Sequence, residues 1–183
     1  MVLRADAQRN LERVLDAATE TFAASGPDAS IDEIARRAGV GHATVFRRFP
    51  TKDDLMLAVI ERRVAEIHTI LDEELAAPDP GEAFYRFIWR LAELHMRAPG
   101  LHECVRHCVG NEKPGAAEID KLAEKLIARA QKAGTVRRDL KPADVKTLIQ
   151  SVLQSAPEKQ WRRYLSVVLD GLRPSSELRV HGL

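Results

Sequence analysis

The sequence is poor in cysteine and contains no long apolar run. Its 183 residues include two cysteines, Cys104 and Cys108, which a reducing cytosol would keep as thiols, so we expect no disulfide framework. No uninterrupted apolar stretch approaches the roughly 18 residues of a membrane-spanning helix, and charged residues such as Arg4, Asp6 and Arg9 interrupt the N-terminal stretch. We therefore expect a cytoplasmic protein with no membrane partner.

Signatures of catalysis are absent too. The sequence has no phosphate-binding glycine loop, no His-Glu-x-x-His zinc motif and no nucleophile elbow. The acidic pairs Asp53-Asp54 and Glu73-Glu74 are typical of solvated charges on helix surfaces. These absences argue against an enzyme, and they give no reason to expect a cofactor or a bound metal.

Strand-like alternation is also missing, and helical periodicity runs along the chain. Between Lys52 and Ala77 there is neither glycine nor proline, and apolar residues recur at helical spacing, which predicts a helix of about 40 Å. Pro142 and Pro157 open two final helical segments. We expect an all-α protein with two parts, an N-terminal head over residues 1–51 and a C-terminal helical body over residues 52–183.

Turn and cap residues in the head predict two short helices. Gly26-Pro27 ends the first long helix, and Ser30-Ile31-Asp32-Glu33 matches a capping box that starts a second helix at Ser30. Gly39 suits the positive φ that ends this helix in a tight turn. A third helix over residues 41–48 stops before Pro50. Two short helices joined by a glycine turn are typical of a helix-turn-helix, whose second helix enters the DNA major groove.

The positions of the charged residues favour DNA binding, although the net charge of the chain does not. The formal net charge of +1 gives no general preference for nucleic acid, yet residues 34–52 contain five basic side chains and no Asp or Glu. Small or polar residues that allow close approach to base edges begin the predicted recognition helix: Gly41, His42, Ala43 and Thr44. We expect phosphate contacts from Ser30, Arg47, Arg48 and Lys52.

The segment from Ser30 to Leu55 reads SIDEIARRAGVGHATVFRRFPTKDDL and closely resembles the DNA-binding head of the TetR (tetracycline-repressor-like) family. The likeness extends over residues 11–57. It implies a transcriptional repressor that binds double-stranded DNA at a palindromic operator as a homodimer and is released by a small-molecule effector. In this family a tyrosine that reaches phosphate usually stands at the position of Phe46, which is a DNA-binding candidate here without that hydroxyl.

The expected body offers candidates for effector binding, although an aromatic row at helical spacing is more often plain core. The candidates are Phe87, Trp89, Leu91, His95, Cys104 and Cys108. Because Cys104, His107 and Cys108 share one helical face and carry soft ligands, a metal- or thiol-responsive regulator stays open as an alternative. A helical protein-interaction module without DNA binding is an alternative of another class, but it would not need an acid-free recognition helix.

Two apolar rows in the last helical segments predict a two-fold homodimer. Such a dimer would place two recognition helices about 34 Å apart in successive major grooves. The alternative is that both rows are buried within one subunit. The residues predicted to form the interface are Leu148, Val152, Trp161, Leu165, Val168, Leu169 and Leu172.

Overall fold

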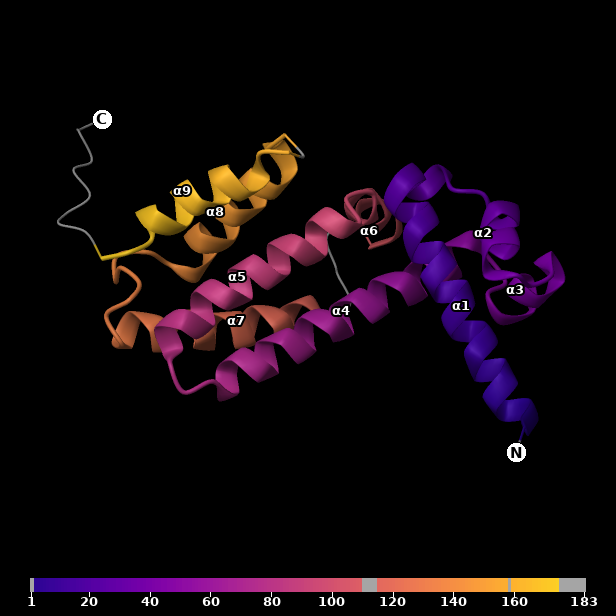
Figure 1. Cartoon of the computed structure of the whole chain (residues 1–183), viewed down its shortest axis with the longest axis horizontal. Coiled ribbons are helices and arrows are strands. Elements are labelled where there is room, and N and C mark those ends of the chain that lie inside the picture. Colours follow the sequence, from indigo (N-terminus) through magenta and orange to yellow (C-terminus); the bar gives the residue numbers. More distant parts are fainter. Residues whose placement is uncertain (1, 110–114, 158, 175–183) are drawn as a thin grey trace. The chain divides into compact units, whose positions relative to one another are not determined.

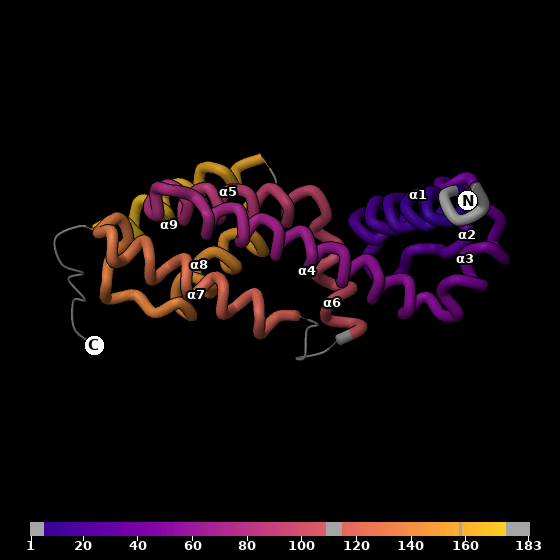
Figure 2. Tube along the Cα trace, turned by 90° about the horizontal axis from the view of Figure 1, so that it is seen from below, coloured from indigo at the N-terminus to yellow at the C-terminus, as the bar shows by residue number. Residues whose placement is uncertain are grey.

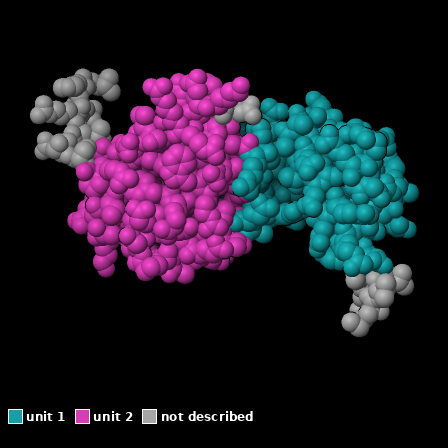
Figure 3. Space-filling model, viewed as in Figure 1, with its two compact units in different colours: residues 1–66, 97–116 teal, residues 67–96, 117–183 magenta. Residues whose placement is uncertain are grey.

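The computed structural model describes residues 2–109, 115–157 and 159–174. Over these ranges the chain is helical and has no strand, which confirms the all-α prediction (Figure 1). The chain divides into two compact units (Figure 3). Each unit has its own hydrophobic core. The first unit comprises Met1–Glu66 and Arg97–Ala116, and the second comprises Ile67–Met96 and Ala117–Leu183.

The first unit contains the predicted head. Its core includes the fully buried side chains of Phe22, Ile34 and Leu55. α2 packs on α1, and α3 packs on α2 (Figure 2). Its elements are α1 (Val2–Ser25), the 3-10 helix η1 (Gly26–Asp28), α2 (Ile31–Ala38), α3 (His42–Arg48), the first part of α4 (Lys52–Ala76) and α6 (Leu101–Val109).

Local turn signals fix where the short helices begin and end. Gly39 has a φ of 64°, in the left-handed region that favours glycine. In this conformation the N–H groups of Gly39 and Val40 donate to the carbonyls of Arg36 and Ala35, at 3.2 and 3.1 Å, and so close the end of α2. The predicted starts and ends of the second and third helices are confirmed to within one residue.

The second unit is a bundle of longer helices around α5. Phe84, Phe87, Ile88 and Ala92 on α5 are buried in its core. The long fourth helix is confirmed as unbroken over its 25 residues, and it begins in the first unit and ends in the second. The other helices of this unit are α5 (Pro80–Arg97), α7 (Ala116–Lys132), α8 (Pro142–Ser155) and α9 (Trp161–Gly171).

The packing divides the chain differently from the expected boundary after residue 51. Leu55, Met56 and Val59 in the first turns of α4 are buried in the core of the first unit. Leu101 and Cys104 of α6 join the same core, although they lie far along the chain. The head therefore needs the start of α4 and a returning helix, because α1, α2 and α3 have apolar faces that these segments cover.

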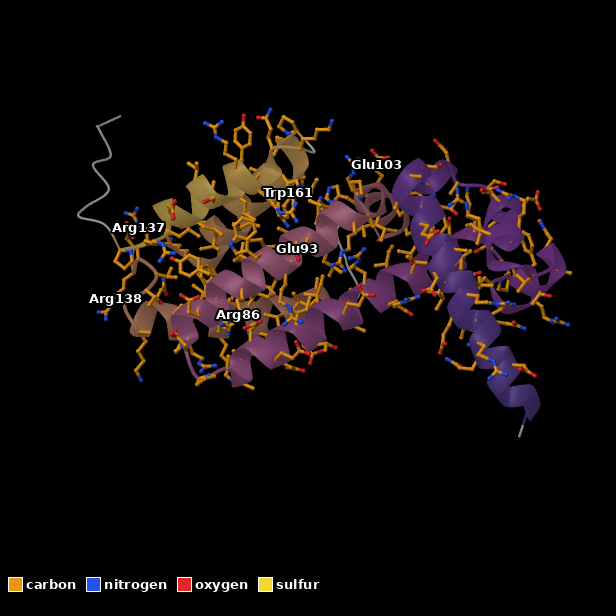
Figure 4. All side chains as sticks on the ribbon, in the orientation of Figure 1. Arg86, Glu93, Glu103, Arg137, Arg138 and Trp161 are labelled. Carbon is orange, nitrogen blue, oxygen red and sulfur yellow. The ribbon has the colours of Figure 1, made fainter. Side chains whose placement is uncertain are left out.

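Glu74 in the second unit corrects the expectation of a solvated acidic pair. Its side chain is buried, and its carboxylate accepts hydrogen bonds from Arg86 Nε at 3.1 Å and Arg90 Nη1 at 3.0 Å (Figure 4 labels Arg86). Arg90 also pairs with the exposed Glu73 at 2.6 Å. A buried carboxylate needs such partners, because removing it from water unpaired is costly. The acidic pair therefore ties α4 to α5.

Candidate nucleic-acid interface

One face of α3 is buried and the opposite face is open to solvent. Val45 and Phe49 pack into the core of the first unit together with Ile34 and Ala38 of α2. Seven of the nine predicted DNA-binding residues lie on α3 or at its N-cap. Of these, Thr44 is half-buried, and the exposed ones are Gly41, His42, Ala43, Phe46, Arg47 and Arg48.

The start of α2 differs from the predicted capping box. Ser30 does stand at the N-cap position, but its side chain makes no capping hydrogen bond. The Glu33 carboxylate instead accepts hydrogen bonds from Arg36 and Arg37, each at a shortest distance of 2.6 Å. These guanidinium groups, Arg36 first, hold the pKa of Glu33 below its usual value. The two arginines are thus paired, while the Ser30 hydroxyl stays exposed and available.

The remaining cations flank α3. Arg47 and Arg48 stand in its last turn, and over the described residues neither has an ion-pair partner. Lys52 is the first residue of α4, which a reciprocal cap begins. The Thr51 N–H donates to Asp54 at 2.9 Å, and the Asp54 N–H donates to the Thr51 hydroxyl at 3.1 Å. Arg47 and Arg48 are therefore exposed at the end of α3 without the acidic partners that neutralise Arg36 and Arg37, while Lys52 is half-buried at the start of α4.

His42 has two side-chain partners, neither of which the sequence analysis predicted. Its Nδ1 pairs with the carboxylate of Asp32 on α2. Its ring stacks on Phe46 one turn later, with centroids 4.5 Å apart and an angle of 26° between the planes. The stack follows from the four-residue spacing on one helix. The pair with Asp32 depends on how the turn folds α3 back along α2, and no local sequence signal marks it.

The predicted dimer interface needs correction. Trp161, Leu165, Leu169 and Leu172 are buried in the core of their own subunit, so these four cannot present a surface to a partner. They face inward because α9 packs against α8 and the rest of the bundle (Figure 4 labels Trp161). Leu148, in contrast, is 40% exposed, and Val152 and Val168 are half-buried.

A different apolar face on α8 and α9 is open in the single chain. On α9, Tyr164 and Val167 are exposed, Val167 to 67%, and Val168 lies on the same side. On α8, Leu148 and Val152 occupy the equivalent positions, four residues apart. Because α8 and α9 contact each other, these five residues, here called the α8–α9 face, lie on neighbouring helices (Figure 1).

The effector candidates do not form one cluster. Phe87 is buried in the core of the second unit, where Trp89, Leu91 and His95 are half-buried. The Trp89 ring lies 6.0 Å from the Trp161 ring. The two cysteine candidates belong to the first unit instead.

Cys104 and Cys108 are packed as ordinary core thiols. Cys104 is fully buried, and this burial raises its pKa to about 11, so the thiol stays protonated at neutral pH. Cys108 lies 3.9 Å from the Met56 sulfur, while His107 is half-exposed beside Asp53. Among the residues that the structure describes, no three His, Cys, Asp or Glu side chains could together hold a metal ion, and no helix is long and apolar enough to cross a bilayer.

Comparison with known proteins defines the class. Residues 14–59 match the model of the tetR family of bacterial regulatory proteins, and residues 79–174 match the C-terminal domain of SbtR-like transcriptional regulators. The solved structure of a TetR transcription regulatory protein from Mycobacterium vanbaalenii is 42% identical and has a TM-score of 0.72, over 94% of this chain and 99% of that chain. These matches identify the class as helix-turn-helix transcriptional regulators.

Relatives of known sequence agree with this class. The repressor KstR of Mycolicibacterium smegmatis is 30% identical over 144 residues, which cover 75% of this chain and 71% of that protein. The regulator TtgW of Pseudomonas putida is 43% identical over 60 residues, and this match spans only 45% of its length. A repressor of Mycobacterium tuberculosis is 45% identical over 65 residues, which span 35% of its length. The chain belongs to the TetR family of transcriptional regulators.

Proposed function

We propose that the protein is a transcriptional repressor that binds a palindromic operator as a homodimer and is released by a small-molecule effector. One observation carries the DNA-binding part. Buried Val45 and Phe49 fix α3 so that its opposite face, with His42 at the start and Arg47 and Arg48 at the end, is free to enter a major groove.

Each of the nine DNA-binding candidates has a role in this proposal. Gly41, His42, Ala43 and Thr44 meet base edges, because the N-terminal turn of a recognition helix enters the groove first. The cations at the end of α3 and the start of α4 bind backbone phosphates and set the register without reading sequence. Phe46 supports the His42 ring rather than reaching phosphate. The exposed Ser30 hydroxyl is a further phosphate ligand.

A mobility-shift titration with the DNA upstream of the protein's own gene tests this function. Arg47, Arg48 and Lys52 in two subunits give six phosphate contacts, so a log–log plot of the binding constant against salt should have a slope of about −5. Competitor DNA of random sequence should bind much more weakly. Binding that does not change with salt would rule out the phosphate contacts.

Lys52→Ala and Thr44→Ala are expected to affect binding in different ways. Lys52→Ala removes two phosphate contacts from a dimer, so it should weaken binding to all DNA sequences by about tenfold and lower the salt slope by about 2. Thr44→Ala removes a groove contact, so it should change the ranking of operator variants at one position. The measurement is a set of titrations against single-base operator variants. A change of ranking in Lys52→Ala would contradict these roles.

The homodimer of this proposal uses the α8–α9 face. Two copies of this face related by a dyad would form a four-helix interface that removes Leu148, Tyr164 and Val167 from water. Exposed apolar side chains on two neighbouring helices are typical of such interfaces. This interface replaces the one predicted from the sequence. Trp161, Leu165, Leu169 and Leu172 are left out of it because they are already buried in the core of the single chain.

Effector release depends on the second unit and on α4. Trp89, Leu91 and His95 are half-buried in this unit and are the proposed effector ligands. The start of α4 packs in the first core and its end packs in the second, so a bound effector that shifts α4 would alter the head. Both tryptophans of the sequence, Trp89 and Trp161, lie in this unit, which makes intrinsic fluorescence a suitable readout for screening small molecules.

A further inference from the structure

One polar contact joins a residue outside the predicted site to the start of the recognition helix. The carboxylate of Asp32 on α2 pairs with Nδ1 of His42 on α3. We propose that Asp32 is a positioning residue that fixes the hydrogen-bonding direction of His42, so that Nε2 accepts a hydrogen bond from an amino-bearing base, adenine or cytosine. This inference rests on the proposed function, in which His42 faces base edges.

The chemistry of the pair determines which nitrogen carries the proton. An ionised carboxylate can only accept hydrogen bonds, so the Nδ1 atom that faces Asp32 is the protonated one. A neutral imidazole has a single N–H, and its other nitrogen is then an acceptor. The partner of one ring nitrogen thus sets the role of the other, and Nε2 of His42 presents a lone pair.

A lone pair at this place discriminates between two classes of base. In the major groove adenine offers its N6 amino group and cytosine its N4 amino group, while guanine and thymine offer only acceptors at the corresponding edge. An acceptor on the protein matches an amino base and opposes a keto base. At the operator position that His42 contacts, the base on the strand nearer to His42 should therefore be adenine or cytosine rather than guanine or thymine.

The surroundings of His42 support a fixed ring. Phe46 stacks on one face of the imidazole, and Asp32 holds its Nδ1 edge. The His42 side chain is still half-exposed, and the neighbouring Ala43 is too short to cover it. The ring is therefore oriented by two contacts while it stays accessible to a ligand. Since a contact between two exposed side chains adds little to stability, Asp32 can be replaced without unfolding the head.

The first test observes the tautomer in the full-length protein without DNA. Long-range ¹⁵N–¹H correlation spectra at pH 8.5 should show His42 with a protonated Nδ1 and an unprotonated Nε2, assigned by comparison with His42→Gln. Asp32→Ala should convert these signals to a mixture of tautomers, and Asp32→Glu should restore the original pattern. Glu33→Ala is the matched control. It removes the same charge from the same turn of α2, but the wild-type Glu33 pairs with Arg36 and Arg37 rather than with His42.

The second test measures base preference on duplexes selected from a random pool. The wild-type protein should prefer A or C over G or T by about tenfold at one position of each half-site, the difference that one hydrogen bond supplies. His42→Ala and Asp32→Ala should lose this preference, since alanine offers no hydrogen-bond acceptor, while Asp32→Glu and Glu33→Ala keep it.

The outcomes separate the inference from the function on which it rests. If no duplex is selected at all, both the proposed function and the role of Asp32 are wrong. If an operator is selected but Asp32→Ala keeps the same preference, or if Nε2 of His42 carries the proton in the free protein, DNA binding stands and the role of Asp32 is wrong.

Discussion

The double variant Leu148→Glu/Val167→Glu is expected to be a folded monomer that binds operator DNA at least about 100-fold more weakly than the wild type. Both side chains are exposed in the single chain, so the new carboxylates leave the subunit core intact. In the proposed dimer they would lie in the seam, where burying unpaired charges is costly. Loss of the dimer leaves one recognition helix per complex and removes the gain that two linked half-sites provide.

A matched control separates this effect from the added charge. Gln150→Glu/Ser166→Glu places the same charges on exposed positions of the same two helices, on the side away from the α8–α9 face. This control should sediment as a dimer and bind DNA nearly as the wild type does. Analytical ultracentrifugation and circular dichroism give the two readouts. A Leu148→Glu/Val167→Glu protein that stays dimeric would place the interface elsewhere.

Leu165→Glu is expected to differ from the two surface double variants, because Leu165 lies in the core. Leu165 lies two residues before Val167, on the opposite side of α9, and is completely buried. A glutamate there would put a charge into the core of its own subunit, so this variant should lose its fold rather than its partner.

Gly100→Ala is expected to lower the free energy of unfolding by about 2–3 kcal/mol, because the added methyl group has no space. A Cβ at this position would lie 2.3 Å from the carbonyl oxygen of Phe22 and 2.7 Å from that of Ala23. Both are backbone atoms, so the end of α1 or the start of α6 must move. The Gly100 N–H also donates to the Ala23 carbonyl at 3.2 Å, and this bond would lengthen.

Urea denaturation followed by circular dichroism measures this loss. Gly41→Ser is a suitable comparison, since Gly41 has an ordinary extended φ of −72° and an added Cβ meets only the Thr44 hydroxyl oxygen, at 3.8 Å. Serine is also a good N-cap residue, so its stability should equal that of the wild type or exceed it slightly. An unchanged midpoint for Gly100→Ala would mean that α6 does not pack against the end of α1 as described.

The short helices of the head were predictable because their boundaries depend on local chemistry. Gly39 ends α2 in the left-handed region, and Pro50 follows the end of α3, so each signal acts within a few residues. The capping box was wrong for an equally local reason. Glu33 has two arginines within reach on its own helix, and their guanidinium groups compete successfully with the backbone N–H of Ser30.

Contacts between distant segments were not predictable from periodicity. Leu165 and Val168 belong to the same apolar row in the sequence, and only the packing of α9 in the bundle decides that Leu165 is buried while Val168 is half-buried. Glu74 reads as a surface charge until α5 brings Arg86 and Arg90 to it. The pairing of Asp32 with His42 likewise depends on the angle between two helices, which no single segment encodes.

Selection of duplexes from a random DNA pool by the full-length protein tests the central claim most directly. A dimeric repressor with one recognition helix per subunit should enrich an inverted repeat whose half-site centres lie about one helical turn apart, 10–10.5 base pairs. The Thr44→Ala protein should enrich a related repeat that differs at one position of each half. A wild-type pool that stays random after repeated rounds would contradict sequence-specific DNA binding by this chain.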